Sequence, residues 1–131
     1  MKTFFMIKPD GVKRNIIGDV INRVERKDFV ITKMKMVQIT PELAEKHYGE
    51  HSEKPFFNDL VNFITSGPVE ALEVEGENAV LAIRELMGAT NPADADPGTI
   101  RGDLASKLEE NVVHGSDSEE SADRELGLFF N

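Results

Sequence analysis

Short apolar runs alternate with amphipathic segments along this chain. Residues 3–7 form a β-branched and aromatic run typical of a buried strand, and the Pro-Asp-Gly at 9–11 predicts a turn directly after it. Apolar residues recur at helical spacing over 16–27, which predicts an amphipathic helix. Apolar and polar residues alternate imperfectly over 29–39, which indicates a long strand with a twist or a bulge.

The same alternation continues through the middle of the chain. Thr40 and Pro41 predict the N-cap and first position of a short helix. Helices are predicted over 55–66 and 77–87, with a strand over 69–75 between them. These elements are all short enough to belong to one compact domain.

The segment 88–102 has neither helical nor strand periodicity. Loops of this length in a compact domain are usually functional or disordered, and its two prolines together with Ile100 favour a functional loop. A short helix over 104–108, a strand that contains His114 and a helix that runs to Phe130 complete the pattern. We expect the long loop to border a functional site.

Four strands with interspersed helices predict an α/β (α+β) two-layer sandwich. A doubly wound sheet is less favoured, because too few helices remain to cover a second face, so we expect the helices on one main face. The length of 131 residues suits a single domain over 1–131.

The composition indicates which kinds of molecule the chain is not expected to bind. The chain has 24 acidic and 15 basic residues, for a formal charge of −9, which makes nucleic acid an unlikely partner because its binders normally need a basic face. No apolar run approaches membrane-spanning length, and charge interrupts the N-terminus too early for a secretory signal. The absence of cysteine excludes disulfides and thiol catalysis. These features predict a cytoplasmic protein without a membrane partner.

The segment 111–118 is the part of the sequence with the most candidate catalytic residues for its length. It delivers His114 to a glycine at the end of a short β-branched strand, and Ser116 with Glu119 fits a capping box that would open a helix beside the imidazole. Such a helix start favours a bound anion, and a neutral imidazole is both a nucleophile and a base. Glu125, about two turns into that helix, could orient one ring nitrogen. A surface histidine before a capped helix is the alternative interpretation.

A phosphate site in this chain has to be assembled from scattered residues, because the P-loop and G-x-G-x-x-G signatures are absent. The candidate ligands around His114 are Lys8, Arg84, Thr90 and Arg101, which lie at element ends or in the long loop. Arginine pairs with phosphate oxygens in a bidentate fashion and keeps its charge in a partly dry cleft.

Two further features carry less specific signals. His47 and His51 are spaced like a metal pair, but a glycine lies between them and no further ligands cluster nearby, so a metal site is not favoured there. Phe56 and Phe57 fit a hydrophobic core, although one of them could serve as a stacking platform at the edge of a cleft.

Long, ordered motifs give the chain a resemblance to a known family. From residue 3 to residue 129 it resembles the nucleoside diphosphate kinases. The motifs that carry the resemblance are FMIKPDGVKR at 5–14, TSGPV at 65–69, TNPAD at 90–94, PGTIRGD at 97–103 and NVVHGSDS at 111–118.

The resemblance implies a ferredoxin-like fold with a four-stranded antiparallel sheet. It also implies transfer of the γ-phosphate of a nucleoside triphosphate, typically ATP, to a nucleoside diphosphate by a ping-pong route through a phosphohistidine on His114. Glu125 and Ser116 match the residues that hold the ring. Lys8 and Tyr48 correspond to residues near the transferred phosphate and the sugar hydroxyl.

The remaining site residues are also implied by position in the family. Magnesium, Mg²⁺, would be held by the nucleotide phosphates, and stacking on an aromatic ring would allow broad base specificity. By resemblance, the phosphate ligands are Arg84, Thr90 and Arg101, and some members add a ligand at the position of His51. The base would stack on Phe56, and Asn111 would bind the ribose hydroxyl. Asp117 would contact magnesium through a water molecule.

The family further implies a homo-oligomer, a tetramer or a hexamer built from dimers. Asn15 replaces a glycine that is common in the family, with a small local effect expected. The alternative function is a catalytically idle nucleotide-binding regulatory protein on the same scaffold. The joint presence of His114, Glu125, Lys8 and Asn111 argues against it, because an idle protein has no physical need for the full set.

Overall fold

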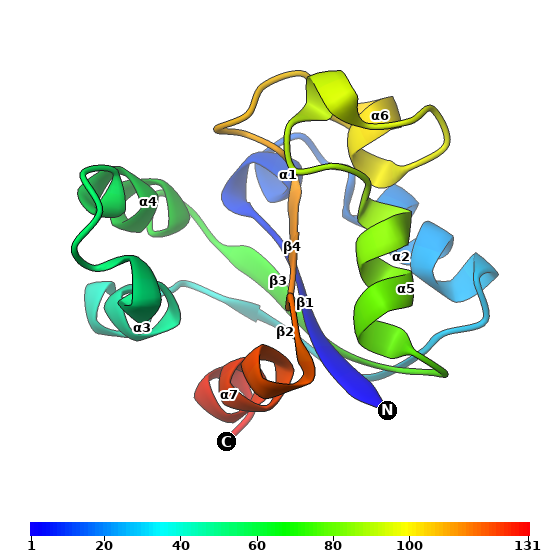
Figure 1. The fold of residues 1–131 in the computed structure, drawn as a ribbon, viewed down its shortest axis with the longest axis horizontal. Helices are drawn as coiled ribbons and strands as arrows, with labels where there is room; N and C mark the ends of the chain where they lie inside the picture. The colour runs from blue at the N-terminus through cyan, green and yellow to red at the C-terminus, as the bar shows by residue number, and fades with distance from the viewer.

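Four strands form one antiparallel sheet in a computed structural model, which describes residues 1–131 except for the side chain of Glu50. The strands are β1 (Lys2–Ile7), β2 (Val30–Val37), β3 (Val69–Glu75) and β4 (Val113–Gly115). Their order across the sheet is β2-β3-β1-β4, and each neighbouring pair is antiparallel, so the predicted sheet is confirmed (Figure 1). A register shift between Ile31 and Lys33 is the irregularity expected in the long strand.

The helices lie on both faces of this sheet (Figure 1). None of those in the described part of the chain is both long and apolar enough to cross a membrane. The α-helices are α1 (Pro9–Lys13), α2 (Ile17–Arg26), α3 (Pro41–His47), α4 (Phe57–Ile64), α5 (Ala79–Met87), α6 (Ile100–Leu104) and α7 (Glu119–Phe129), and the 3₁₀-helices are η1 (Gly49–His51) and η2 (Pro92–Asp94).

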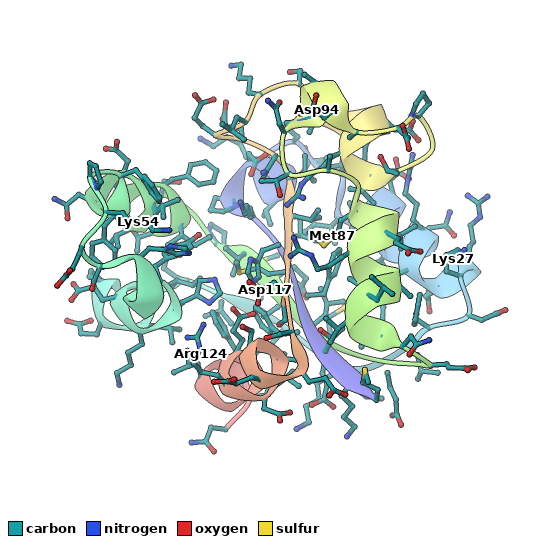
Figure 2. The ribbon with its side chains drawn as sticks, in the orientation of Figure 1. Lys27, Lys54, Met87, Asp94, Asp117 and Arg124 are labelled. Carbon is teal, nitrogen blue, oxygen red and sulfur yellow. The ribbon has the colours of Figure 1, made fainter. Side chains whose placement is uncertain are left out.

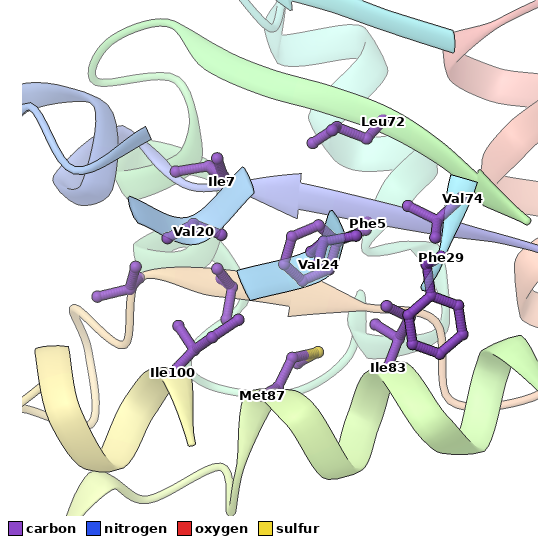
Figure 3. Packing of buried hydrophobic residues seen from close by; sticks show 12 residues of the cluster. Phe5, Ile7, Val20, Val24, Phe29, Leu72, Val74, Ile83, Met87 and Ile100 are labelled. Carbon is purple, nitrogen blue, oxygen red and sulfur yellow. The ribbon is translucent and has the colours of Figure 1, made fainter. Parts of the chain in front are cut away.

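Alternate residues of β1 feed two separate hydrophobic cores, as the period of two along a strand requires. Phe5 and Ile7 pack with α2, α5 and α6, the cluster drawn in Figure 3. Phe4 and Met6 pack on the other face with α3, α4 and α7. The expectation of helices on one main face therefore needs correction. The helices between β2 and β3, together with the C-terminal helix, supply the second cover.

Several local predictions are confirmed and others are corrected. Thr40 caps α3, and its Oγ1 accepts a hydrogen bond from the amide of Leu43 at 3.1 Å. The predicted turn at 9–11 instead continues into α1, because Pro9 occupies the first helical position, where its missing N–H costs nothing. The short helix expected over 104–108 lies earlier, as α6, which begins inside the segment predicted to be a loop and ends at Leu104.

Candidate active site

The edge strand β4 and its neighbour β1 position His114. It is the middle residue of β4 and pairs with Met6 of β1. Helix α5 lies close against the strand, because a Cβ on Gly115 would stand 2.5 Å from the sulfur of Met87. This approach brings Arg84 of α5 to the strand end, where its Nη1 donates to the carbonyl of Gly115 at 3.0 Å.

Glu125 of α7 orients the imidazole of His114. Its Oε1 lies 2.9 Å from Nε2 of His114 and accepts a hydrogen bond from the Oγ of Ser116 at 2.7 Å. Burial opposes the charge of Glu125, but the hydrogen bond and charge of His114, with His47 and Ser116, outweigh it and lower the pKa to about 2. An ionised carboxylate only accepts, so Nε2 carries the proton in this contact, and Nδ1 has a lone pair whenever the ring is neutral.

This arrangement corrects the predicted capping box. The cap of α7 is Ser118, whose Oγ accepts from the amide of Ser121 at 3.0 Å. Ser116 is buried and bonds to Glu125 instead. Its expected partnership with Glu125 is therefore present, whereas its predicted role at the helix start is wrong.

Lys8, Asn111 and Thr90 form a connected group beside His114. The Nζ of Lys8 donates to Oδ1 of Asn111 at 2.8 Å, and Nδ2 of Asn111 donates to the carbonyl of Thr90 at 3.0 Å. Burial and then the charge of Arg101 lower the pKa of Lys8 to about 8, while Asp10 acts in the opposite direction. The lysine therefore keeps most of its charge at neutral pH.

Arg101 is buried and supports the backbone of this region. Its Nε, Nη1 and Nη2 donate to the carbonyls of Asn111, Gly88 and Val113 at 3.2, 3.2 and 2.7 Å. Burial, with the charge of Arg84, lowers the pKa of Arg101 to about 10, so the guanidinium remains charged. The expectation that the long loop borders the site is confirmed, because Arg101 bonds to Val113 of the strand that carries His114 and Thr90 bonds to Asn111 just before that strand.

A hollow of about 130 Å³ collects the polar groups around His114. In Figure 2, Asp117 lies between α5 on one side and α3 with α7 on the other. Phe56 is at the margin, with its ring centroid 6.1 Å from that of His51. The residues that line the hollow are His47, Tyr48, His51, Arg84, His114, Gly115, Asp117 and Glu125.

His47 is the residue in this hollow that the sequence interpretation did not assign to the site. Its ring packs edge-on against that of His114, with centroids 4.8 Å apart. The side chain is buried, and neither ring nitrogen has a hydrogen-bond partner among the described residues. Its spacing from Leu43 and Ala44 on the inner side of the helix was the available signal, since that stripe faces the core.

His47, His114 and Glu125 have ligand atoms within 4.8 Å of one another, which is close enough to consider a metal. His51 is not part of this group, so the His47 and His51 pair considered from spacing is not assembled as such. Burial and then the charge of His114 lower the pKa of His47, Glu125 acts in the opposite direction, and Arg124 and Lys8 add to the lowering. The positive charges of Arg124 and Lys8 oppose a bound cation. The surroundings suit a phosphate better than a metal ion.

The family of the chain follows from comparison with known proteins. The family model for nucleoside diphosphate kinase matches residues 1–131. The chain belongs to this family. As a nucleoside diphosphate kinase family member it is an enzyme that transfers phosphate between nucleotides.

Relatives and solved structures agree with this assignment. The nucleoside diphosphate kinase of Exiguobacterium sibiricum is 63% identical over 129 residues, which is 98% of this chain and 94% of that protein. That of Archaeoglobus fulgidus is 60% identical over 98% of this chain and 85% of its own length. The halophilic nucleoside diphosphate kinase of Halobacterium salinarum in complex with CDP superposes with a TM-score of 0.97 and 51% identity, covering 100% of this chain and 88% of that chain.

Proposed function

We propose that this enzyme passes the γ-phosphate of a nucleoside triphosphate to a nucleoside diphosphate through a phosphohistidine at Nδ1 of His114. The observation that carries the proposal is the 2.9 Å contact between Nε2 of His114 and an ionised Glu125. It holds one ring nitrogen protonated and leaves the other as a nucleophile in the hollow that Arg84 also lines.

In the first half-reaction the lone pair of Nδ1 attacks the γ-phosphorus. A bond from nitrogen to phosphorus forms, the bond from the γ-phosphorus to the bridging oxygen breaks, and the diphosphate leaves. The ring gains positive charge as the bond forms, and Glu125 stabilises that charge through Nε2–H. In the second half-reaction a β-phosphate oxygen of the acceptor attacks the same phosphorus, and the bond to Nδ1 breaks.

Phosphoryl transfer depends mainly on alignment and on neutralising the charge of the phosphate oxygens. Arg84 lines the hollow, and Lys8, which bonds to Asn111, is near enough for its charge to act on His47 in the lining. Arg101 uses three of its five N–H groups on backbone carbonyls, so it contributes charge and two remaining donors. Magnesium bound to the nucleotide phosphates would supply charge neutralisation, and Asp117, a carboxylate in the lining of the hollow, would contact it through water.

The nucleoside would lie against residues at the margin of the hollow. The exposed ring of Phe56 offers a surface for stacking, which tolerates any base and so supports broad base specificity. Asn111 would contact a ribose hydroxyl, and His51 and Thr90 the phosphates. Burial raises the pKa of Tyr48 to about 12, so its hydroxyl stays protonated and can act as a hydrogen-bond donor.

The same proposal includes the domain organisation, the cellular location and the oligomeric state of the enzyme. We infer a single catalytic domain over residues 1–131 that works in the cytoplasm as a homo-oligomer, a tetramer or a hexamer of dimers. The edge strand β2 supports an oligomer, because Val30, Met34 and Met36 are exposed along it. Edge strands with exposed apolar side chains are surfaces that proteins normally cover.

The test is a two-stage labelling experiment. The protein is incubated with magnesium and γ-labelled ATP, freed of nucleotide, examined for acid-labile label and then mixed with GDP. We expect one label per chain that moves to GTP, none in His114→Ala, and normal labelling in the control Glu120→Gln at an exposed position of α7. Nucleotide binding without label on the wild-type chain would leave a binding protein and overturn the proposal.

A further inference from the structure

Val112, two residues before His114, has an unusual backbone conformation. Its φ is 73°, and the amide of Val113 donates to the carbonyl of Asn111 at 2.8 Å. Together these values define a γ-turn centred on Val112, in the strained form that proteins rarely use. A positive φ is especially unfavourable for a β-branched residue, so other contacts must hold the turn.

The segment after β1 supplies those contacts. Oδ2 of Asp10 accepts a hydrogen bond from the amide of Val112 at 3.0 Å, and the amide of Lys8 donates to the carbonyl of Val112 at 2.8 Å. Both polar backbone groups of the strained residue are thereby bonded. Gly11 also permits the approach, since a Cβ there would lie 3.3 Å from the carbonyl oxygen of Val112.

The turn separates two side chains that face the site from different sides. Asn111 precedes it and bonds to Lys8 and to the loop at Thr90. His114 follows it and reaches Glu125. If the turn relaxed toward negative φ, the direction of the chain between Asn111 and His114 would change, and the two side chains could not keep both sets of partners.

Asp10 has no other assignment in the chemistry described above. Its side chain is buried, and Oδ1 has no hydrogen-bond partner among the described residues. Burial raises the pKa of Asp10, while the hydrogen bond from Val112 and the charge of Lys8 act in the opposite direction. Burial of a carboxylate is unfavourable unless a contact compensates for it, and the hydrogen bond from the amide of Val112 is such a contact.

We propose that Asp10 is a positioning residue for phosphoryl transfer, which holds the γ-turn at Val112 and thereby fixes Asn111 relative to His114. The inference rests on the proposed roles of His114 and Asn111. Asp10 acts through the backbone amide of Val112, so the acceptor oxygen matters more than the negative charge.

The test compares Asp10→Ala, Asp10→Asn and the control Asp123→Ala, which lies on the exposed side of α7. Single-turnover labelling with magnesium and γ-labelled ATP gives the rate of phosphorylation and the fraction of chains that become labelled. We expect Asp10→Ala to reach the wild-type fraction at a rate roughly 10 to 100 times lower, since small misplacements of reacting groups cost that much. Asp10→Asn keeps an acceptor and should stay within about threefold of the wild type.

The two readouts separate positioning from a loss of folded protein. A merely structural role would lower the labelled fraction and leave the rate of the folded chains unchanged, and that result would overturn the proposal. A tenfold or larger slowing of Asp10→Asn at full labelled fraction would also overturn it, because the acceptor is then not what matters. This variant decides the question if Asp10→Ala does not fold. Absence of label on the wild type, or label on His114→Ala, would instead refute the proposed function.

Discussion

The imidazole of His47 packs edge-on against that of His114, with ring centroids 4.8 Å and ring planes 75° apart. Nδ1 of His47 also lies 3.9 Å from Oε2 of Glu125. Burial, and next the charge of His114, lower the pKa of His47 to about 3, although Glu125 acts in the opposite direction. The uncharged ring of His47 therefore covers one side of the pair formed by His114 and Glu125 at physiological pH.

The lowered pKa of His47 predicts a dependence of folding stability on pH. An unfolded chain protonates His47 near pH 6.5, whereas the folded chain does so only near pH 3, so protons favour the unfolded state between these values. We expect the free energy of unfolding to fall as pH drops from 6.5 to 4.5, with a contribution of up to about 1.4 kcal/mol per pH unit. Glu125 adds its own loss only below about pH 4.5, because its pKa is lowered in the folded state.

Urea unfolding at pH 7.0, 6.0 and 5.0 measures this slope. The variant His47→Gln should show a flatter dependence over the same range, because it removes the group that takes up the proton. Lys8, Arg124, Glu125 and His114 surround His47 and remain in the variant. Equal slopes in the two proteins would show that His47 does not carry the effect.

The contact between His114 and Glu125 predicts a loss of rate without a loss of binding. Glu125→Gln removes the negative charge that stabilises the ring during transfer, so we expect phosphorylation to slow on the order of 100-fold. Ser116→Ala removes one of the two hydrogen bonds to Oε1 and should have an intermediate effect. Rates from single-turnover labelling, with nucleotide affinity measured separately, test both. A wild-type rate in Glu125→Gln would contradict the assigned role.

The three backbone contacts of Arg101 predict a stability effect at a residue expected to bind phosphate. Lysine keeps a positive charge but cannot reach the carbonyls of Asn111, Gly88 and Val113 together. Arg101→Lys should lower the free energy of unfolding by about 2 kcal/mol or more. The exposed Arg26→Lys is the matched control. Equal urea midpoints for the two variants would mean that these contacts do not stabilise the fold.

The exposed apolar residues of β2 predict the surface used for assembly. A charge at Met34 would lie in the middle of that strand, so Met34→Asp should lower the mass of the particle measured by light scattering. Leu81→Asp, at another exposed apolar position on α5, serves as the control and should leave the mass unchanged. If only the control changed the mass, the contact surface would lie elsewhere.

Much of the local structure was predictable because it depends on neighbours in the chain. The strand at 2–7, the helix at 17–26 and the cap at Thr40 follow from periodicity and from hydrogen bonds that span a few residues. Asn15 fits its place for the same reason. Its φ is 61°, and asparagine tolerates this left-handed conformation better than any residue other than glycine.

The errors arose where a distant partner competes with a local one. Ser116 had a suitable local role at a helix start, but the buried carboxylate of Glu125 binds its hydroxyl and leaves Ser118 to cap the helix. The number of helices likewise did not reveal that helices cover both faces of the sheet. Which face a helix covers depends on how the chain returns between strands, and no local pattern records that.

Most elements of the fold, the family and many of the proposed site residues follow from the sequence, because repeated apolar spacing and long motifs are properties of the chain. The tertiary structure alone decided how those residues meet. The edge-on packing of His47, the three backbone contacts of Arg101 and the hydrogen bond from Val112 to Asp10 join positions up to 102 residues apart. Such contacts exist only when the fold brings α3, α6 and the end of β1 against the segment that carries His114.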